Sequence, residues 1–447
     1  MEILAILLFV LIFILILKGY PVAFTLGGVS VLFGFVVYYI NPELFHAAEF
    51  NALPSRFKGV MNNYVLMAVP LFIFMGIMLE KSGLAENLLE TMAILFGKVR
   101  GGLAISVVIV GALLAASTGI VGATVVTMGL ISLPTMLKRG YQPELATGTI
   151  AAAGTLGQII PPSIVLVLLA DTISNSSSTG AVDVGTMFRA ALLPGFLLVI
   201  CYIVYIIVIA NIKKDIAPAM PQDVIDELMT SDNFIMRVIS AFVLPLLLIV
   251  AVLGSIFAGI ASPTEAAAVG ALGATLLTIL QRKFSFTILK DVMQQTTHLT
   301  SMVFLILLGA TTFSLVFRTM GGDTYLVELI EGANLSPMMF LLIVMLMIFV
   351  AGFFIDFIEI IFIIVPVVTP IFDALGMDML WVGVLIAMNL QTSFLTPPFG
   401  FSLFYLKGVA PEGVSTQMIY RGIVPFIIIQ IIFLGLIIMF PNLLYLV

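Results

Sequence analysis

Hydrophobic runs fill most of this chain, and short polar connections separate them. Runs long enough to cross a bilayer, about 20 apolar residues each, occupy 2–17, 21–40, 64–80, 143–170, 190–212, 237–257, 263–280, 297–317, 379–406 and 418–440. Two further segments, 102–137 and 338–373, are long enough to cross twice, but small and polar residues interrupt each one midway. Because their arms are short for full spans, we expect two re-entrant helical hairpins. The pattern predicts an all-α polytopic membrane protein with about ten transmembrane helices.

The composition agrees with this class. Hydrophobic residues make up 62% of the chain and charged residues 9%, with a mean hydropathy of +1.25. A soluble protein carries about 25% charged residues, and a β-barrel would show short alternating segments, so both are excluded. The net charge of −6 argues against a nucleic-acid partner. Residues 1–17 have no basic flank or cleavage motif, so they are interpreted as a first transmembrane helix within the lipid bilayer.

Two short stretches repeat along the chain. Residues 155–163 and 391–399 both interrupt an apolar segment with polar residues and a Pro-Pro pair. The same spacing places Pro134 on Pro370 and Gly140 on Gly376. The repeating unit is therefore a hairpin, a turn and a broken helix. Broken helices at corresponding positions of two repeats are the best sequence pointer to the binding site of a secondary transporter.

The distribution of basic residues predicts the orientation of the repeats. We place the N-terminus outside and let each hairpin return to its own side. Of the 18 lysines and arginines, only Arg56, Lys58, Arg189 and Arg318 then fall outside, as the positive-inside rule requires. The first hairpin opens from the cytoplasm and the second from outside, so we expect an inverted repeat with both termini outside. The amphipathic segments 81–100 and 281–296 are expected along the cytoplasmic surface.

The Pro-Pro pairs predict cation sites. Each pair removes two amide donors, so carbonyls one turn upstream lose their partners. Irregular backbone at membrane depth is tolerated only where it is buried in protein or lines a wet cavity. Such carbonyls, with hydroxyls, form a cage for a hard monovalent cation. We predict two sodium sites, each between a hairpin tip and the broken helix after it. The candidate ligands are Ser117, Thr118, Gly122, Gly154, Thr155, Asp356, Thr392, Ser393 and Thr396. The alternative is a Pro kink that only shapes packing.

The same tips and breaks carry the candidate substrate contacts. No lysine or arginine occurs in 101–137 or 338–406, so an anion there would rely on half-helix N-termini and on bound sodium. By linkage, sodium and substrate would raise each other's affinity. Glu359, an acidic residue predicted deep in the membrane, has equal claims to the site and to a polar seam. The candidate substrate contacts are Thr124, Gln158, Pro161, Glu359, Asn389 and Pro397. Glu265, three residues after Ser262, is interpreted as a helix cap, with a share in the substrate cavity as the alternative.

These motifs resemble the large membrane (M) subunit of the tripartite ATP-independent periplasmic (TRAP) transporters over essentially the whole chain. The segments that carry the resemblance are 19–24, 122–125, 154–163, 262–268, 354–356 and 395–400. The resemblance implies a sodium-driven importer of small carboxylates in the bacterial inner membrane, with periplasmic termini. It also implies two partners, a separate small membrane (Q) subunit and a periplasmic substrate-binding (P) protein. Many relatives carry a Ser-Gly-Ser tip, whereas this chain has Ser117-Thr118-Gly119, so the ligands of the first sodium site are less certain.

The resemblance further implies an elevator mechanism, in which one group of helices moves against another. The expected units are scaffold helices at 1–100, a first transport repeat at 101–172, scaffold and connecting helices at 173–336, a second transport repeat at 337–408 and a C-terminal helix at 409–447. The main alternative is a stand-alone sodium:anion symporter or exporter of similar architecture. An enzyme is disfavoured because no Ser-His or paired-Asp arrangement lies at matching depth, and a channel because closed tips suit alternating access.

Overall fold

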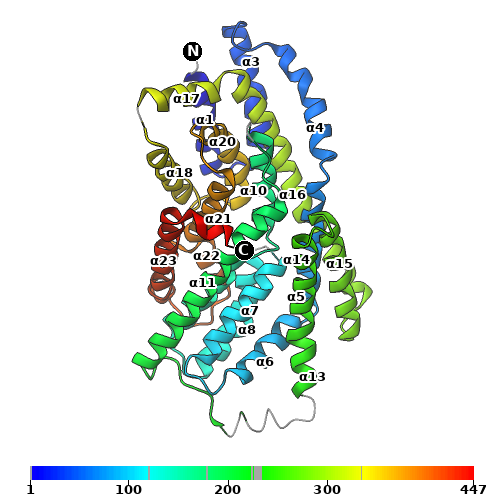
Figure 1. The fold of residues 1–447 in the computed structure, drawn as a ribbon, viewed down its shortest axis with the longest axis vertical. Helices are drawn as coiled ribbons and strands as arrows, with labels where there is room; N and C mark the ends of the chain where they lie inside the picture. The colour runs from blue at the N-terminus through cyan, green and yellow to red at the C-terminus, as the bar shows by residue number, and fades with distance from the viewer. Residues whose placement is uncertain are drawn as a thin grey trace.

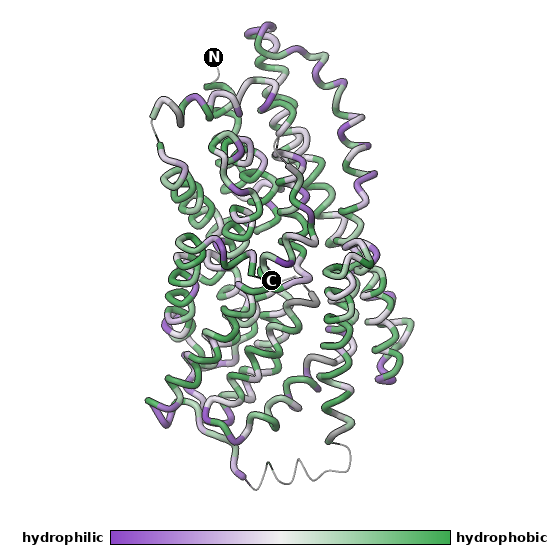
Figure 2. Tube along the Cα trace, in the orientation of Figure 1, coloured by the Kyte–Doolittle hydropathy of each residue, from purple (hydrophilic) through white to green (hydrophobic). Residues whose placement is uncertain are grey.

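A computed structural model describes residues 3–118, 121–177, 180–222, 225, 234–333 and 335–446. Within these ranges the chain folds into helices joined by short connections, and no strand occurs (Figure 1). Hydrophobic residues follow most of the helices, while hydrophilic residues gather mainly at helix ends and connections (Figure 2). The prediction of an all-α protein is therefore confirmed.

The two repeats contain nine helices of the described chain. The first repeat comprises α7 (Gly102–Thr118), α8 (Val121–Lys138), α9 (Pro143–Thr155) and α10 (Ile164–Ser176). The second comprises α18 (Pro337–Ala351), α19 (Phe357–Ile363), α20 (Val365–Ala374), α21 (Met379–Leu395) and α22 (Phe401–Val409).

The remaining helices precede, separate or follow the repeats. They are α1 (Ile3–Leu17), α2 (Val22–Phe24), α3 (Ser30–Ile40), α4 (Leu53–Met61), α5 (Ala68–Lys81), α6 (Leu84–Leu95), α11 (Val184–Ile212), α13 (Phe234–Val238), α14 (Leu244–Phe257), α15 (Pro263–Leu280), α16 (Phe286–Thr319), α17 (Gly322–Gly332) and α23 (Thr416–Met439). A π-helical turn, Thr25–Val29, joins α2 to α3 in one continuous helix.

Several of these helices can cross a membrane. By length and composition, the described residues contain seven such helices, or up to nine if each bent pair forms one span. One bent pair is α19 with α20, which meet at 49° in the second predicted hairpin. The broken helices and the short α1 are not among these spans, so the number of crossings stays a prediction.

The predicted surface segment 281–296 is wrong as a separate element. Ser285 caps a helix that runs without interruption from Phe286 to Thr319, 34 residues in all, or about 51 Å. No proline interrupts this stretch, so its polar first half and its apolar second half form one continuous helix. In contrast, the segment 81–100 does hold a distinct helix, α6, which follows Gly83 in the left-handed conformation (φ 70°). Helix α4, between the predicted spans 21–40 and 64–80, was not predicted.

The two copies of the repeat match in detail. Helix α9 begins at Pro143 and α21 at Met379, which are equivalent positions. Gly140 and Gly376 both adopt positive φ, 77° and 68°. Each stands at a helix end closed by the hydrogen-bond pair of a Schellman motif, in which a left-handed glycine follows the last helical turn. The pairs are Gly140 N to Leu137 O at 3.0 Å with Tyr141 N to Met136 O at 3.0 Å, and Gly376 N to Asp373 O at 2.9 Å with Met377 N to Phe372 O at 3.0 Å.

Helix α11 shows that the copies are inverted. Its 29 residues span about 43 Å. The turn of the first copy lies at its C-terminal end, where Gln142 N donates to Ile216 O at 2.9 Å. The turn of the second copy lies at its N-terminal end, where Asp378 borders the same cavity as Asp183. The hairpins accordingly lie in opposite halves of the molecule, α7 and α8 low and α18 and α20 high in Figure 1.

Contacts between connections join segments that were predicted on the same side. On the predicted cytoplasmic side, Gly101 N donates to Ala217 O at 3.0 Å. On the predicted outer side, the Asn63 amide donates to Asp171 Oδ1 at 2.6 Å and an Arg318 guanidinium nitrogen donates to Ser176 O at 3.2 Å. The relative placement of these connections thus agrees with the predicted topology, while which side faces the cytoplasm stays a prediction.

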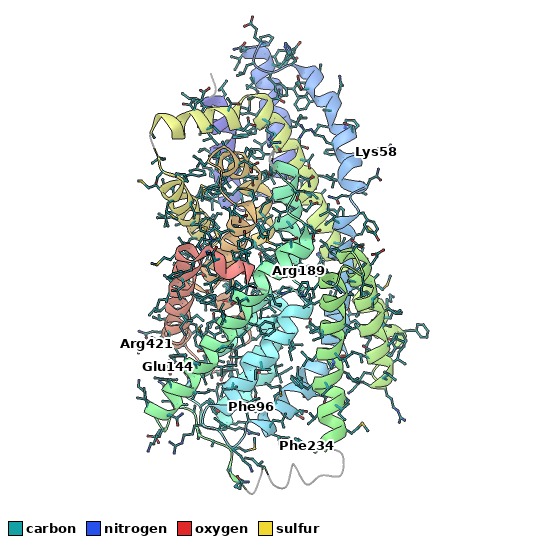
Figure 3. All side chains as sticks on the ribbon, viewed as in Figure 1. Lys58, Phe96, Glu144, Arg189, Phe234 and Arg421 are labelled. Carbon is teal, nitrogen blue, oxygen red and sulfur yellow. The ribbon has the colours of Figure 1, made fainter. Side chains whose placement is uncertain are left out.

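The helices pack in two groups. In the first, α7 and α8 pack on α9, α8 also packs on α22, α18 packs on α21, and α19 and α20 pack on α10. Each hairpin therefore touches both broken helices. Helices α11 and α23 join this group, and Figure 3 shows Glu144 of α9 near Arg421 of α23. In the second group, α5 packs on α15 and α16, and α14 packs on α15.

Candidate functional site

Both helices predicted to be broken are interrupted at their Pro-Pro pairs. Helix α9 ends at Thr155, a 3-10 turn covers Leu156–Gln158, and α10 begins at Ile164. In the second copy, α21 ends at Leu395 and α22 begins at Phe401. Both Pro-Pro peptide bonds, 161–162 and 397–398, are cis. The predicted interruption is therefore confirmed in each copy.

The first hairpin lies directly on the first broken helix. A Cβ atom at Gly157 would lie 2.5 Å from the Ala115 carbonyl oxygen of α7, and one at Gly154 would overlap the Val125 side chain of α8. Only glycine allows this close approach of the two backbones. The predicted ligands Ser117 and Thr118 follow Ala115, but their side chains lie outside the residues that the structure describes. Their part in a cation site stays a prediction.

The second hairpin meets the second broken helix in the same way. A Cβ atom at Gly352, at the end of α18, would lie 2.8 Å from Ser393 Cβ and would overlap Ser393 Oγ. The predicted ligand Gly122, at the start of α8, packs under the Tyr405 ring of α22, which would lie 3.0 Å from an added Cβ. The structure thus brings Ser393 to its hairpin tip, and it brings the first tip to the other broken helix.

Four predicted sodium ligands whose hydroxyl groups the structure describes, Thr155, Thr392, Ser393 and Thr396, use their protons locally. Each donates to a backbone carbonyl one turn earlier, so its oxygen lone pairs remain available to a cation. The bonds run from Thr155 to Ala152 O at 2.9 Å, from Thr392 to Met388 O at 2.9 Å, from Ser393 to Leu390 O at 2.8 Å and from Thr396 to Thr392 O at 2.7 Å.

Asp356 and Glu359 cap the helix that leads away from the second tip. The Phe357 amide donates to Asp356 Oδ1 at 2.8 Å, and the Asp356 amide donates to Glu359 Oε2 at 3.2 Å. This reciprocal arrangement is a capping box. Both side chains are half-buried, and the described part of the chain holds no ion pair to either carboxylate. The tip therefore carries negative charge that a cation would offset.

The remaining predicted substrate contacts lie in different surroundings. Gln158 is fully buried, and neither polar atom of its side chain has a partner among the described residues. Thr124 is also buried. The Asn389 amide instead donates to Met345 O of α18 at 2.6 Å, so it fastens the second hairpin to α21. Pro161 borders an apolar cavity of about 430 Å³ against α14, whereas Pro397 is half-exposed.

The prediction missed Gln391, which belongs to the repeated motif. Its side chain is fully buried in α21 and lies beside the Tyr202 hydroxyl of α11. Helix α21 packs on the 3-10 turn that holds Gln158. A polar residue at a fully buried position of an apolar helix was the available signal. In contrast, the expected cap at Glu265 is confirmed, because Glu265 and Ser262 form a capping box at the start of α15.

The sequence matches known proteins over nearly its whole length. The family model described as the DctM component of the tripartite ATP-independent periplasmic transporter matches residues 9–443. The chain is 32% identical to the C4-dicarboxylate TRAP transporter large permease protein DctM of Pseudomonas aeruginosa, covering 89% of each chain. It is 27% identical to the sialic acid TRAP transporter large permease protein SiaM of Vibrio cholerae, over 96% of this chain and 94% of that one.

A likeness to a solved structure concerns the fold alone. The YdaH transporter of Alcanivorax borkumensis superposes with a TM-score of 0.62 at 14% identity, covering 88% of this chain and 89% of the other. This likeness supports a helical transporter architecture.

Proposed function

The chain belongs to the DctM family of tripartite ATP-independent periplasmic transporters, and from this premise we propose that it drives sodium-coupled uptake of a small organic acid. The family places it in a tripartite system as the large permease of the inner membrane. We propose that its partners are a small membrane subunit and a periplasmic substrate-binding protein. The observation that carries the proposal is the contact of each hairpin with a helix broken at a Pro-Pro pair.

The second tip offers the better supported cation site. Thr392, Ser393 and Thr396 direct their protons to backbone carbonyls, and the Asp356 carboxylate carries negative charge at the facing tip. Hydroxyl, carbonyl and carboxylate oxygens suit a hard cation such as sodium. We propose that these residues hold one sodium ion. The first site would use Gly122, Gly154 and Thr155 together with Ser117 and Thr118.

The substrate would lie between the two tips. Gln158 lies in the first break with an amide group that has no partner among the described residues, and this amide can donate to a carboxylate and accept from a hydroxyl. Relatives are named for C4-dicarboxylates, sialic acid and ectoine. We therefore propose a small carboxylate as the substrate class. Bound sodium would lower the cost of placing this anion beside Asp356 and Glu359.

The two packing groups suggest how the site could change sides. The repeats, α11 and α23 form one group, and α5, α14, α15 and α16 form the other. We propose that the first group moves as the transport domain and that the second stays fixed as the scaffold. Under this proposal α11 and α23 move with the repeats, because both pack on broken helices.

Uptake by proteoliposomes tests the proposal. The chain and its small membrane subunit are reconstituted together, and the binding protein with radiolabelled substrate is added outside. An inward sodium gradient should drive accumulation, whereas equal sodium on both sides or a potassium gradient should not. Accumulation that ignores the sodium gradient would overturn the coupling. Equal uptake without the binding protein and small subunit would favour a stand-alone symporter instead.

A further inference from the structure

A polar cavity away from the hairpin tips contains two arginines that the repeats lack. It measures about 570 Å³ and opens between α4, α16 and the C-terminal end of α10. Arg56 of α4 and Arg318 of α16 line it, together with Asn63, Asp171 and Thr172. A cavity of this size can hold a small organic acid.

The two guanidinium groups are close enough to repel each other. Partial burial and the neighbouring Arg318 guanidinium lower the pKa of Arg56. Within the ranges that the structure describes, Arg56 forms no ion pair. Arg318 has one long ion pair, 3.8 Å between its Nε and Asp323 Oδ2, and a second guanidinium nitrogen donates to Ser176 O at 3.2 Å. Two like charges that face one cavity favour an anion between them.

Further polar groups in this cavity also lack partners. Arg318 Nε and the Thr172 hydroxyl are buried and have no hydrogen bond to any described residue. Thr172 as a whole is only 6% exposed. Buried polar groups are normally hydrogen-bonded. These two donors have no hydrogen-bond partner in the described part of the protein, which indicates that they bind a ligand or a water molecule.

The carboxylate of Asp171, which also lines the cavity, already has hydrogen-bond partners. Asp171 accepts hydrogen bonds from the Asn63 and Asn175 side chains, and no ion pair joins it to either arginine in the described part of the chain. The cavity lining therefore combines two guanidinium groups with amide side chains. A carboxylate fits the guanidinium groups, and a hydroxyl or ammonium group fits the amide oxygens and Asp171.

We propose that this cavity binds the carboxylate of a small organic anion through Arg56 and Arg318, as a second site distinct from the hairpin tips. This proposal rests on the proposed function in one respect: the bound anion belongs to the class of small organic acids that the protein is proposed to transport. The walls of the cavity come from both packing groups, since Arg318 belongs to α16 and Thr172 belongs to α10, while Arg56 belongs to α4, which packs on α16. Movement of the repeats would separate these walls, so the anion would bind only in the arrangement seen here and would stabilise it.

Protection from arginine modification tests the site in the purified complex with its small subunit. Phenylglyoxal is added without any sodium gradient or binding protein, and mass spectrometry follows each arginine. Succinate should slow modification of Arg56 and Arg318, while the neutral analogue succinamide should not. Arg421, exposed on α23, should react at the same rate throughout. Equal rates at Arg56 with and without saturating succinate would overturn the proposal.

Two variants separate a local site from a diffuse positive surface. Arg56→Gln should weaken succinate protection of Arg318 by roughly tenfold or more, the usual effect of losing a charged hydrogen bond. Lys58→Gln removes the same charge from the same helix, on the flank of the molecule (Figure 3), and lies outside the cavity lining. It should leave protection unchanged. Equal losses in both variants would instead indicate a docking surface for an acidic protein. Because no transport is measured, failure of sodium coupling leaves this result intact.

Discussion

Replacing Gly352 with alanine should weaken sodium binding at the second hairpin tip. Gly352 ends α18 with φ −66°, which alanine adopts freely, so no backbone strain enters. The added Cβ would lie 2.8 Å from Ser393 Cβ, whereas carbon atoms rest about 3.5–4 Å apart. The tip would therefore have to retreat by about 1 Å from the broken helix.

The size of the effect follows from the cost of overpacking. Extra methyl groups in well-packed interiors cost about 1–3 kcal/mol. The apo protein escapes this cost by moving the tip, but a sodium ion held between the tip and Ser393 would restore the clash. The cost then appears as lost sodium affinity, roughly 5- to 150-fold. The half-saturating sodium concentration for uptake into proteoliposomes measures it.

Two glycines of the chain provide matched controls. A Cβ at Gly408 of α22 or at Gly435 of α23 would meet no atom within 4 Å. Gly408→Ala and Gly435→Ala should leave the sodium dependence unchanged. Thermal unfolding in detergent shows whether each variant is folded. A folded Gly352→Ala protein with normal sodium half-saturation would refute a cation site between this tip and α21.

Three further substitutions probe other parts of the site. Asp356→Asn keeps the cap on α19 but removes a charge, so the sodium half-saturation should rise at least about tenfold; an unchanged value removes Asp356 from the ligands. Gln158→Met should leave thermal stability nearly unchanged, because its side chain has no described partner, yet it should reduce uptake; normal uptake would show that this amide does not contact substrate. Glu265→Ala breaks a capping box and should lower thermal stability slightly with normal sodium dependence; altered sodium dependence would place Glu265 in the cavity.

The repeat could be predicted because its markers act locally. Gly140 and Gly376 are needed at helix ends that require positive φ, and a Pro-Pro pair interrupts a helix whatever surrounds it. Both features therefore appear in the sequence where they act. Their fixed spacing also gave the correct order of hairpin, turn and broken helix.

The features that were missed or misassigned depend on tertiary contacts. The amphipathic pattern of 281–296 made the start of α16 look like a surface segment, but the helix continues to Thr319 and its Asp291 pairs with Lys81 of α5 at 3.2 Å. Asn389 resembles a ligand in the sequence, yet its partner is a carbonyl of α18. Arg56 and Arg318 are far apart along the chain, and only the approach of α4 to α16 makes them neighbours. Hydropathy and local motifs contain no information on such pairs.

The hydrogen bonds between the two packing groups bear on how far the proposed transport domain could move. Those described include Asn63 to Asp171, Arg318 to Ser176 O and Thr127 to Glu80 at 3.0 Å. A single such bond contributes about 1 kcal/mol net, so breaking these three costs only a few kcal/mol. By contrast, Gly154, Gly157 and Gly352 lock the hairpins onto the broken helices by contacts that leave no room for a methyl group. Helices α5 and α7, and α16 and α19, also pack across this boundary, so a sliding motion of the proposed transport domain would have to exchange those contacts while each hairpin stayed seated on its broken helix.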